Sequence, residues 1–223
     1  MSLPTMETQF KVASEAAQNF VDHFYEARTR RRPLGMFYAS TSARLTGASV
    51  KPDISVNGLP VADVAAYEAM LEGQGGPVVY DISSFDAHPV TAHYKTGEPE
   101  TTGAGGAEGR DATAAAVLRN GDRMSFAIQV SGMIRYTHEH TAPATITAEA
   151  AKGTPPPPGE APSANTNTAF AVGTTPTPAA EAELPEQPFN EAFLLVPHWE
   201  AWARNAPRNL RKWVIVSQNY RTL

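Results

Sequence analysis

The sequence predicts an α+β fold in which helices pack on one face of an antiparallel sheet. Two observations lead to this fold class. Apolar residues recur at helical spacing in the N-terminal part of the chain, and long segments that alternate apolar and polar residues follow in the C-terminal part. Helices followed by long strands that hairpins can join are typical of a sheet with its helices on one face.

The first helix is predicted to begin after Thr5 and to end at or before Arg32. Thr5 can cap its first turn, and Glu7 suits the positive end of the helix dipole. Pro33 ends the helix because the residue before a proline avoids helical backbone angles. The residues of its apolar stripe, spaced by three and four, are Phe10, Ala13, Ala17, Phe20, Val21 and Phe24.

Shorter elements follow this helix. A short helix is expected over Leu34 to Tyr38, and short strands are expected over Ala43 to Thr46 and Ile54 to Val56. A longer helix is predicted over Val61 to Glu72, because it follows a turn and stops at the glycine-rich stretch 73–76. Its expected buried residues are Val64, Tyr67, Met70 and Leu71.

Four long strands are predicted in the rest of the chain, over Val78 to Val90, Met124 to Tyr136, Phe189 to Trp199 and Lys212 to Thr222. In the second of these, one face reads Met124, Phe126, Ile128, Val130, Ile134 and Tyr136, and the other reads Ser125, Ala127, Gln129, Ser131, Met133 and Arg135. The second face is too mixed for a core and too apolar for free solvent. We therefore expect a partner to cover it.

Two stretches are predicted to be disordered loops inserted into a single domain that spans residues 1–223. The larger runs from Thr141 to Gln187, and 30 of its 47 residues are Ala, Thr or Pro. Such a stretch cannot bury enough apolar surface to offset the entropy of ordering it. The smaller runs from Thr96 to Ala112 and has five glycines and no aromatic residue.

Composition excludes several classes of protein. The 223 residues include no cysteine, which excludes disulfide scaffolds, thiol nucleophiles, cysteine-based zinc sites and iron–sulfur clusters. A net charge of −5 argues against a globally basic nucleic-acid binder. No apolar run, the stretch around Phe193 to Val196 included, exceeds five residues, which is far too short for a membrane span, and residues 1–7 lack the features of a signal peptide. We expect a soluble intracellular protein.

Several segments occur in a set order along the chain. They are Phe20 to Tyr25, Phe37-Tyr38 before Arg44-Leu45-Thr46, Val56-Asn57-Gly58, Ser84 to Val90, Phe193 to Pro197 and Val214 to Arg221. Taken in this order, they resemble the nuclear transport factor 2-like family, and above all the small subunits of fungal messenger-RNA export receptors. The resemblance covers all of the chain except the two inserts. Within the fourth segment, Asp86 to Pro89 is similar to the family's Asp-x-Gln-Pro, with His88 in place of the glutamine.

The resemblance implies a cone of curved antiparallel sheet around three helices. It also implies a non-catalytic subunit, without cofactor, that forms a heterodimer sheet to sheet with a related domain on a large subunit. Such a heterodimer would carry mRNA through the nuclear pore by weak contacts with phenylalanine–glycine nucleoporins. Pre-ribosomal particles are a further implied cargo. The implied location is the nucleus, the nuclear pore complex and the cytoplasm, with shuttling between them and no membrane insertion.

The candidate partner interface lies on the mixed sheet face. Its residues combine moderate apolarity with hydrogen-bond donors and acceptors, as interfaces do. They are Asp86, His88, Gln129, Met133, Arg135, Asn219 and Arg221. Arg221 is expected to make a bidentate pair with a carboxylate of the partner.

Two basic groups are candidates for non-specific RNA contact, Arg28, Arg30, Arg31 and Arg32 in the first and Arg208, Arg211 and Lys212 in the second. The alternative for the first group is a set of solvated cations that interact favourably with the C-terminal end of the helix dipole. Neither group is interleaved with aromatic residues that could stack on bases.

Other functions stay open at this stage. An enzyme of the dehydratase or isomerase type would use an Asp or His base with a Tyr donor inside the cone, with Asp81, Asp86, His88 and Tyr25 as candidates. A homodimeric carrier of a GDP-bound GTPase is a third class.

His138 and His140 lie on one face of a strand, which is a spacing that two metal ligands can have. No third ligand is evident nearby, so we expect no metal site. Pro155 to Pro158 is more typical of a spacer than of a polyproline ligand.

Overall fold

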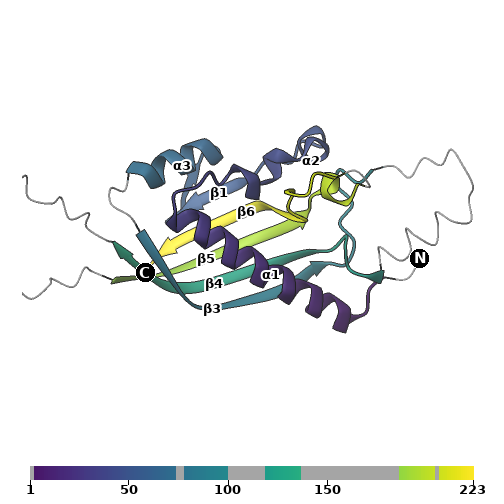
Figure 1. Cartoon of the computed structure of the whole chain (residues 1–223), viewed down its shortest axis with the longest axis horizontal. Coiled ribbons are helices and arrows are strands. Elements are labelled where there is room, and N and C mark those ends of the chain that lie inside the picture. The colour runs from purple at the N-terminus through teal and green to yellow at the C-terminus, as the bar shows by residue number, and fades with distance from the viewer. Residues whose placement is uncertain (1–2, 74–77, 100–118, 137–185, 204–205) are drawn as a thin grey trace, which may run out of the picture. The chain divides into compact units, whose positions relative to one another are not determined.

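The computed structural model describes residues 3–73, 78–99, 119–136, 186–203 and 206–223. Six strands form one sheet in the order β2-β1-β6-β5-β4-β3 (Figure 1). The helices are α1 (Met6–Thr29), α2 (Ala43–Gly47) and α3 (Val64–Gly73). The strands are β1 (Asp53–Val56), β2 (Leu59–Val61), β3 (Val78–Thr91), β4 (Ser125–Tyr136), β5 (Glu186–Pro197) and β6 (Trp213–Thr222). Short 3₁₀ turns cover Gly35–Phe37, Ala39–Thr41 and Trp199–Trp202.

The sheet is mixed, where the sequence predicted an antiparallel one. Strands β3, β4, β5 and β6 are antiparallel neighbours, and so are β1 and β2, but β1 runs parallel to β6. Hairpin-type connections force antiparallel neighbours, whereas β1 and β6 are far apart in the sequence and no short connection sets their relative direction. The curved, unclosed α+β sheet itself agrees with the predicted fold class.

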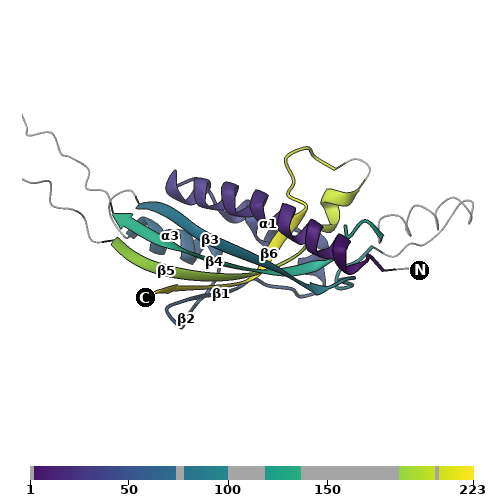
Figure 2. The same ribbon diagram turned by 90° about the horizontal axis from the view of Figure 1, so that it is seen from below.

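Helix α1 forms as the sequence predicts. The hydroxyl of Thr5 accepts a hydrogen bond from the Thr8 backbone N–H at 3.2 Å, which caps the first turn. Arg31, just past the helix, has a φ of +49°, and Pro33 follows. Figure 2 shows the helix lying along one face of the sheet. Most of the predicted apolar stripe is buried there, but Phe10 near the N-terminal end is 48% exposed.

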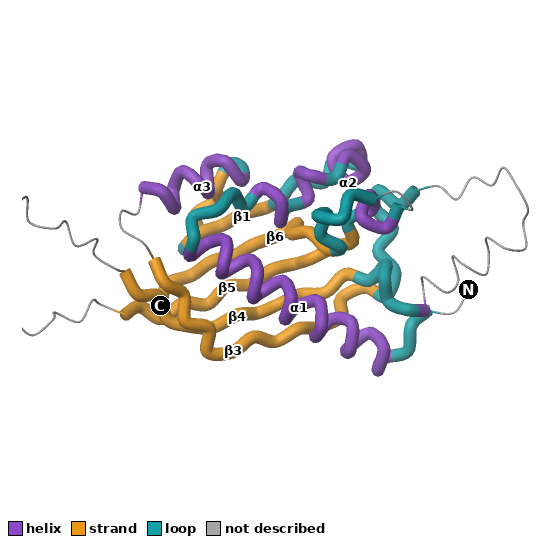
Figure 3. Tube along the Cα trace, viewed as in Figure 1, coloured by secondary structure: helices purple, strands orange, loops and turns teal. Residues whose placement is uncertain are grey.

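Three of the short elements differ from the prediction. The segment expected as a strand over Ala43 to Thr46 is helix α2, because the Ser42 hydroxyl caps the Leu45 N–H at 3.3 Å. The segment over Leu34 to Tyr38 forms a 3₁₀ turn. The helix expected from Val61 starts only at Val64 (Figure 3).

The late start of α3 has a local cause. Asn57 and Gly58 both have positive φ, as a tight hairpin turn requires, so residues 59–61 fold back on β1 as strand β2. The Asp63 carboxylate then accepts a hydrogen bond from the Ala66 N–H at 2.8 Å and starts the helix.

The core lies between α1 and the sheet. Four rings form its centre, with centroids of neighbouring rings 5.0–6.1 Å apart, and they belong to Phe20, Phe24, Phe37 and Phe193. In β4 the predicted alternation is confirmed, since Met124, Phe126, Ile128, Val130 and Ile134 are all buried. A second cluster buries Val196 and Val214 under Leu45 and Trp199.

The smaller predicted insert begins later than expected. The Trp199 indole N–H donates to the Thr96 carbonyl at 2.8 Å, and Glu98 pairs with both His93 and Arg123. Thr96 to Glu98 are therefore part of the folded domain. The rest of both inserts, apart from Pro99 and from Glu186 and Gln187 in β5, lies outside the described residues, so the single-domain organisation with two disordered loops stays a prediction.

Gly132 permits a close approach between β4 and its neighbours. A Cβ on this residue would lie 2.2 Å from the Asp81 carbonyl oxygen and 2.8 Å from Cε1 of Phe189. The register of β3 against β4 shifts at the same place, between Ile82 and Ser84, which leaves Ser83 as an extra residue. The glycine therefore lets the sheet bend at this bulge.

The imidazole of His198 is buried, and its ring nitrogens make no hydrogen bond to the described residues. Only 1% of the residue is exposed. The nearest charged group is the Glu200 carboxylate, with 3.4 Å between Nδ1 and Oε2. Burial lowers the pKa of His198, and the Glu200 charge opposes this shift only in part.

We expect Gly132→Ala to destabilise the fold by about 1–3 kcal/mol, because the added methyl group overlaps backbone that cannot move freely. Urea denaturation of the two proteins measures this difference. Gly47→Ala is the matched control, since a Cβ on Gly47 meets nothing within 4 Å. A Gly132→Ala protein as stable as the wild type would contradict the proposed packing.

We also expect the folded protein to lose stability at acidic pH because of His198. The folded state holds the pKa of His198 below its usual value of about 6.5, so the unfolded chain takes up the proton first as the pH falls. Stability is then complete above pH ~6.5 and falls below it, by at most about 1.4 kcal/mol per pH unit. Urea denaturation of the wild type and of His198→Leu at pH 7.5 and 5.5 measures the effect. The leucine variant should lose less stability between the two pH values.

Candidate protein interface

The sheet face opposite α1 is here called the outer face. Its side chains line up in rows across four strands, because the register places Asp86 opposite Gln129, Gln129 opposite Ala192 and Ala192 opposite Asn219. A neighbouring row contains Ser84, Ser131, Asn190 and Arg221. At one end this face is covered by α2 and the 199–202 turn. Over its central part it carries no helix of the described chain (Figures 1 and 2).

All seven predicted interface residues lie on the outer face. Asp86 and His88 contact each other, with 3.3 Å between Oδ2 and Nε2, and both are exposed. Asn190 accepts a weak hydrogen bond from Gln129 at 3.4 Å and donates one to Ser131 at 3.1 Å. The structure therefore brings the candidate residues together on one surface.

The two arginines of this set differ in their surroundings. Arg135 lies between two carboxylates of its own chain, 3.2 Å from Asp81 and 2.7 Å from Glu186, and half of its side chain is exposed. Arg221 donates only a long hydrogen bond, from Nε to the Asn219 amide oxygen at 3.4 Å. No carboxylate of the described residues lies within ion-pair distance of Arg221. Its planar guanidinium edge is therefore the better placed of the two to receive a partner's carboxylate.

Two large apolar residues of β6 point away from the outer face. Ile215 is fully buried, and Trp213 packs in the core against Phe126 and Trp202, with its indole N–H donating to the Met124 carbonyl at 3.1 Å. A register shift between β5 and β6 leaves Val216 without an opposite residue and changes which side chains of β6 face inward.

A buried ion pair lies on the inner face of the same strands. The Glu191 side chain in β5 is fully buried, and its Oε2 lies 2.9 Å from the Arg28 guanidinium. Two neutral donors also bind this carboxylate, the Tyr25 hydroxyl at 2.5 Å and the Gln218 amide at 2.6 Å. Gln218 in turn bonds to the hydroxyls of Tyr38 and Tyr67. The carboxylate is therefore well satisfied although no water reaches it.

Aromatic rings surround the positive partner of this pair. The Arg28 guanidinium carbon lies 4.4 Å from the ring centroid of Tyr80, 4.6 Å from that of Tyr220 and 5.6 Å from that of Tyr67. Burial and the negative charge of Glu191 hold the pKa of Tyr25 well above its usual value, so this phenol stays a proton donor at neutral pH.

These contacts correct the prediction for Arg28. Its side chain is only 2% exposed and paired with Glu191, so it is not available to RNA phosphates. Glu191 is not among the residues predicted from the sequence. A signal was present, because Glu191 shares the alternation of Phe189, Phe193 and Leu195 and must therefore face the core. A charged residue at such a position requires a buried partner.

The enzyme candidates do not converge on one site. Asp81, Asp86 and His88 are exposed on the outer face, whereas Tyr25 lies inside and donates to Glu191. General acid–base chemistry needs such groups within hydrogen-bond reach of one substrate. The sheet separates Tyr25 from the other three side chains. The set that the sequence suggested for a dehydratase or isomerase is therefore not a catalytic constellation.

The remaining basic candidates stay predictions. Arg30 and Arg32 lie 2.9 Å and 3.8 Å from the Glu26 carboxylate and are more than half exposed. The guanidinium of Arg211 lies 3.8 Å from the Phe37 ring centroid, and the Lys212 ammonium lies 4.9 Å from that of Trp202. Arg31 and Arg32 line one small pocket, while Arg211 and Lys212 line another, and Arg208 is exposed.

Within the described ranges, no three His, Asp or Glu side chains are grouped as a metal site would require. The pair His138 and His140 and the run Pro155 to Pro158 lie outside those ranges. No described helix is long and apolar enough to cross a membrane.

We expect Glu191→Gln to destabilise the protein by about 3–5 kcal/mol, because it leaves the Arg28 charge buried without a counter-ion. Urea denaturation measures the loss. The double variant Arg28→Met with Glu191→Leu removes both charges and should recover much of it. Equal stability of Glu191→Gln and the wild type would show that the pair is not the buried constraint described here.

Comparisons with known proteins extend these observations. No protein-family model and no curated protein matches the chain. Solved structures do match it. One is a Sac3N peptide bound to Mex67:Mtr2, with 24% identity, a TM-score of 0.65 and coverage of 95% of this chain and 99% of that chain. Another is the Chaetomium thermophilum Mex67 NTF2-like domain complexed with Mtr2, with 24% identity, a TM-score of 0.64 and coverage of 95% and 98%.

A structure of Mtr2 matches at 22% identity and a TM-score of 0.61, over 95% of this chain and 99% of that chain. At such identities the likeness establishes the fold. The curved, unclosed sheet with α1 along one face is thus that of the nuclear transport factor 2-like fold, as the resemblance in the sequence implied.

Proposed function

We propose that this chain is the non-catalytic small subunit of an mRNA nuclear export receptor, and that it forms a heterodimer through its outer face with a related domain of a large subunit. The observation that carries the proposal is the open central part of that face, where rows of polar side chains alternate with exposed apolar ones. The similar structures support it, since Mtr2 is complexed with the Mex67 NTF2-like domain in one of them.

The composition of the outer face suits a partner better than solvent. Val79 is 39% exposed, Ala192 is exposed, and Met133 and Leu194 are half-buried. Burying such side chains gives a hydrophobic contribution of about 25 cal/mol per Å². The amides and carboxylates between them supply the directional bonds that fix the register of two sheets.

The mechanism is binding. A partner that binds only the folded chain stabilises that chain by mass action, and the folded chain stabilises the partner domain in the same way. The heterodimer then carries RNA through the nuclear pore by weak contacts with phenylalanine–glycine nucleoporins and shuttles between nucleus and cytoplasm. Pre-ribosomal particles are a second proposed cargo. Direct, non-specific RNA contact would come from the exposed cations Arg30, Arg32 and Arg208, with a steep dependence on salt.

Two other functions make different predictions. A homodimeric carrier of a GDP-bound GTPase would associate with itself in the absence of a larger protein. An enzyme would need a substrate site, and the candidate side chains are divided between the two faces of the sheet. A native pull-down of the chain, followed by mass determination of the complex, separates these functions. A stoichiometric larger protein with a related domain supports the heterodimer, whereas a monomer or a self-associated dimer contradicts it.

We expect Arg221→Glu to weaken binding of this large subunit at least 30-fold, because the reversed charge would be buried against a carboxylate of the partner. Isothermal titration with the purified large subunit measures the dissociation constant. Lys11→Glu is the matched control, since Lys11 is exposed on α1, on the opposite side of the sheet, and should bind like the wild type. Unchanged binding by Arg221→Glu would exclude this residue from the interface.

A further inference from the structure

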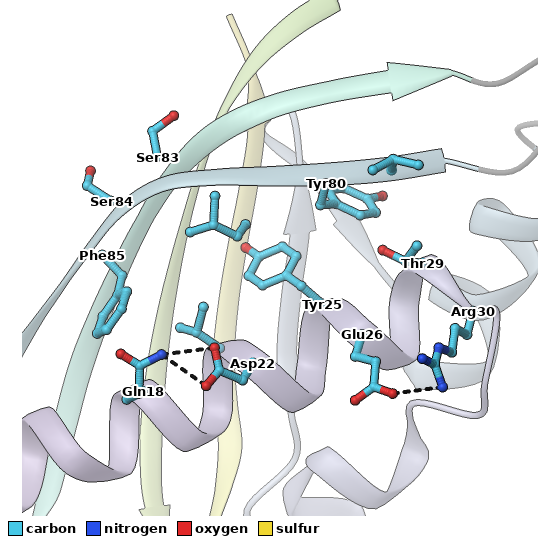
Figure 4. Close-up of a pocket in the computed structure, with 13 residues that line it drawn as sticks. Gln18, Asp22, Tyr25, Glu26, Thr29, Arg30, Tyr80, Ser83, Ser84 and Phe85 are labelled. Carbon is cyan, nitrogen blue, oxygen red and sulfur yellow. Dashed lines mark hydrogen bonds and ion pairs between the residues drawn. The ribbon is translucent and has the colours of Figure 1, made fainter.

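A groove of about 770 Å³ runs between α1 and β3, on the side of the sheet away from the outer face (Figure 4). The helix residues that line it recur at three- and four-residue spacing from Gln18 to Arg30, and the strand residues run from Val79 to Phe85. The helix wall is therefore ~18 Å long, and the stretch of β3 from Val79 to Phe85 spans ~20 Å. An extended peptide of about six residues has this length.

One wall of the groove is a free strand edge. In the described part of the chain β3 pairs only with β4, so the other edge of its 14 residues presents unpaired backbone N–H and C=O groups. Ser83, the extra residue of the bulge, has no partner in β4 either. Such an edge is a template for one more strand, and the chain places an apolar groove directly beside it.

The floor of the groove is apolar. Val21 and Tyr25 of α1 are buried beneath it, and Ile82 and Phe85 of β3 are half-buried along it. Figure 4 shows the Phe85 ring facing α1 near Gln18. Alternate side chains of an added strand would meet these residues, because successive side chains of a strand point to opposite faces.

The lip of the groove is acidic. Both oxygens of the Asp22 carboxylate accept from the Gln18 amide at 2.9 Å, and no cation of the described residues lies within ion-pair distance of them. Glu26, the next carboxylate along the helix, is already paired with Arg30 at 2.9 Å. The charged side chains of the lining, Asp22, Glu26 and Arg30, leave one net negative charge, which is located at Asp22.

We propose that this groove binds an extended, basic segment of another protein, which adds as a strand to the free edge of β3. Its apolar side chains pack on Ile82 and Phe85, and a lysine or arginine pairs with Asp22. The site lies on α1 and the edge strand, where Val79 and Ser84 border both surfaces, and it leaves the rows of the outer face on β4, β5 and β6 available. It therefore goes beyond the proposed heterodimer and does not depend on it.

Other occupants fit less well. A nucleic-acid strand would bring phosphates to the unpaired carboxylate of Asp22, which repels them. A second copy of this chain, joined β3 to β3, would bring a second acidic lip to the same edge and a second helix α1 over it. A basic peptide alone satisfies both the free backbone groups and the charge.

The test uses the full chain and a phage-displayed library of random decapeptides as the probe. We expect the selected peptides to share alternating apolar residues and at least one lysine or arginine. The tightest one, labelled with fluorescein, is then titrated by anisotropy. Asp22→Lys should weaken its binding at least tenfold, and Asp22→Glu should keep it within threefold. Glu15→Lys, the same charge change on the same helix but outside the groove, should bind within twofold of the wild type.

Backbone hydrogen exchange supplies a second measurement. The bound peptide should slow exchange of amides between residues 79 and 85, and Arg221→Glu should not alter peptide binding, which separates this site from the outer face. The proposal is overturned if no basic peptide is selected, if Asp22→Lys binds as well as Glu15→Lys, or if exchange in β3 is unchanged. Competition by a uridine 15-mer, or self-association of the chain that displaces the peptide, also overturns it.

Discussion

The ion pair between Arg28 and Glu191 is the constraint on which the rest of the interior depends. It takes two full charges out of water, which is tolerable only because the carboxylate is bonded by two further donors and the guanidinium is enclosed by aromatic rings. The groups involved come from α1, α3, β3, β5, β6 and the turn after α1. A shift of α1, α3, β5 or β6 would leave a buried polar atom of this network unpaired, and a shift of β3 would withdraw the Tyr80 ring from Arg28.

This arrangement also directs function to the surface. The interior is occupied by close-packed rings and by a polar network whose members bond to one another, so the candidate binding surfaces lie on the outside of the domain. The outer face offers a broad, mixed surface of the kind that related sheets can share, whereas the edge offers backbone hydrogen bonds beside a narrow groove. These two surfaces have different chemistry, and they share Val79 and Ser84 of the edge strand.

Periodicity was enough to predict the long elements. The stripe of α1 and the alternation in β3, β4, β5 and β6 are local properties of the sequence, and the resemblance supplied the fold that joins them. The parallel pairing of β1 with β6 could not be predicted in this way, because it joins segments more than 150 residues apart. Helix α2 was missed since its start depends on one serine cap, and a run of five residues has no clear period.

For the candidate site, too, the sequence predicted what local alternation decides and not what the tertiary fold decides. Alternation placed Asp86, Gln129 and Arg135 on one face correctly, because neighbouring strands align such residues. It failed for Arg28, which belongs by sequence to a run of arginines and by structure to the core. Trp213 and Ile215 face inward because of a bulge in β6. One extra residue in a strand cannot be recognised from the composition of the sequence.

The phenols around the buried pair give the molecule an optical property of its own. Five of the seven tyrosines, namely Tyr25, Tyr38, Tyr67, Tyr80 and Tyr220, have pKa values raised above the usual range, with burial as the main cause. Their ultraviolet absorption therefore keeps the form of the neutral phenol in alkaline solution for as long as the chain is folded. Phenolate absorption from these rings would report the opening of the interior directly, without any added dye or label.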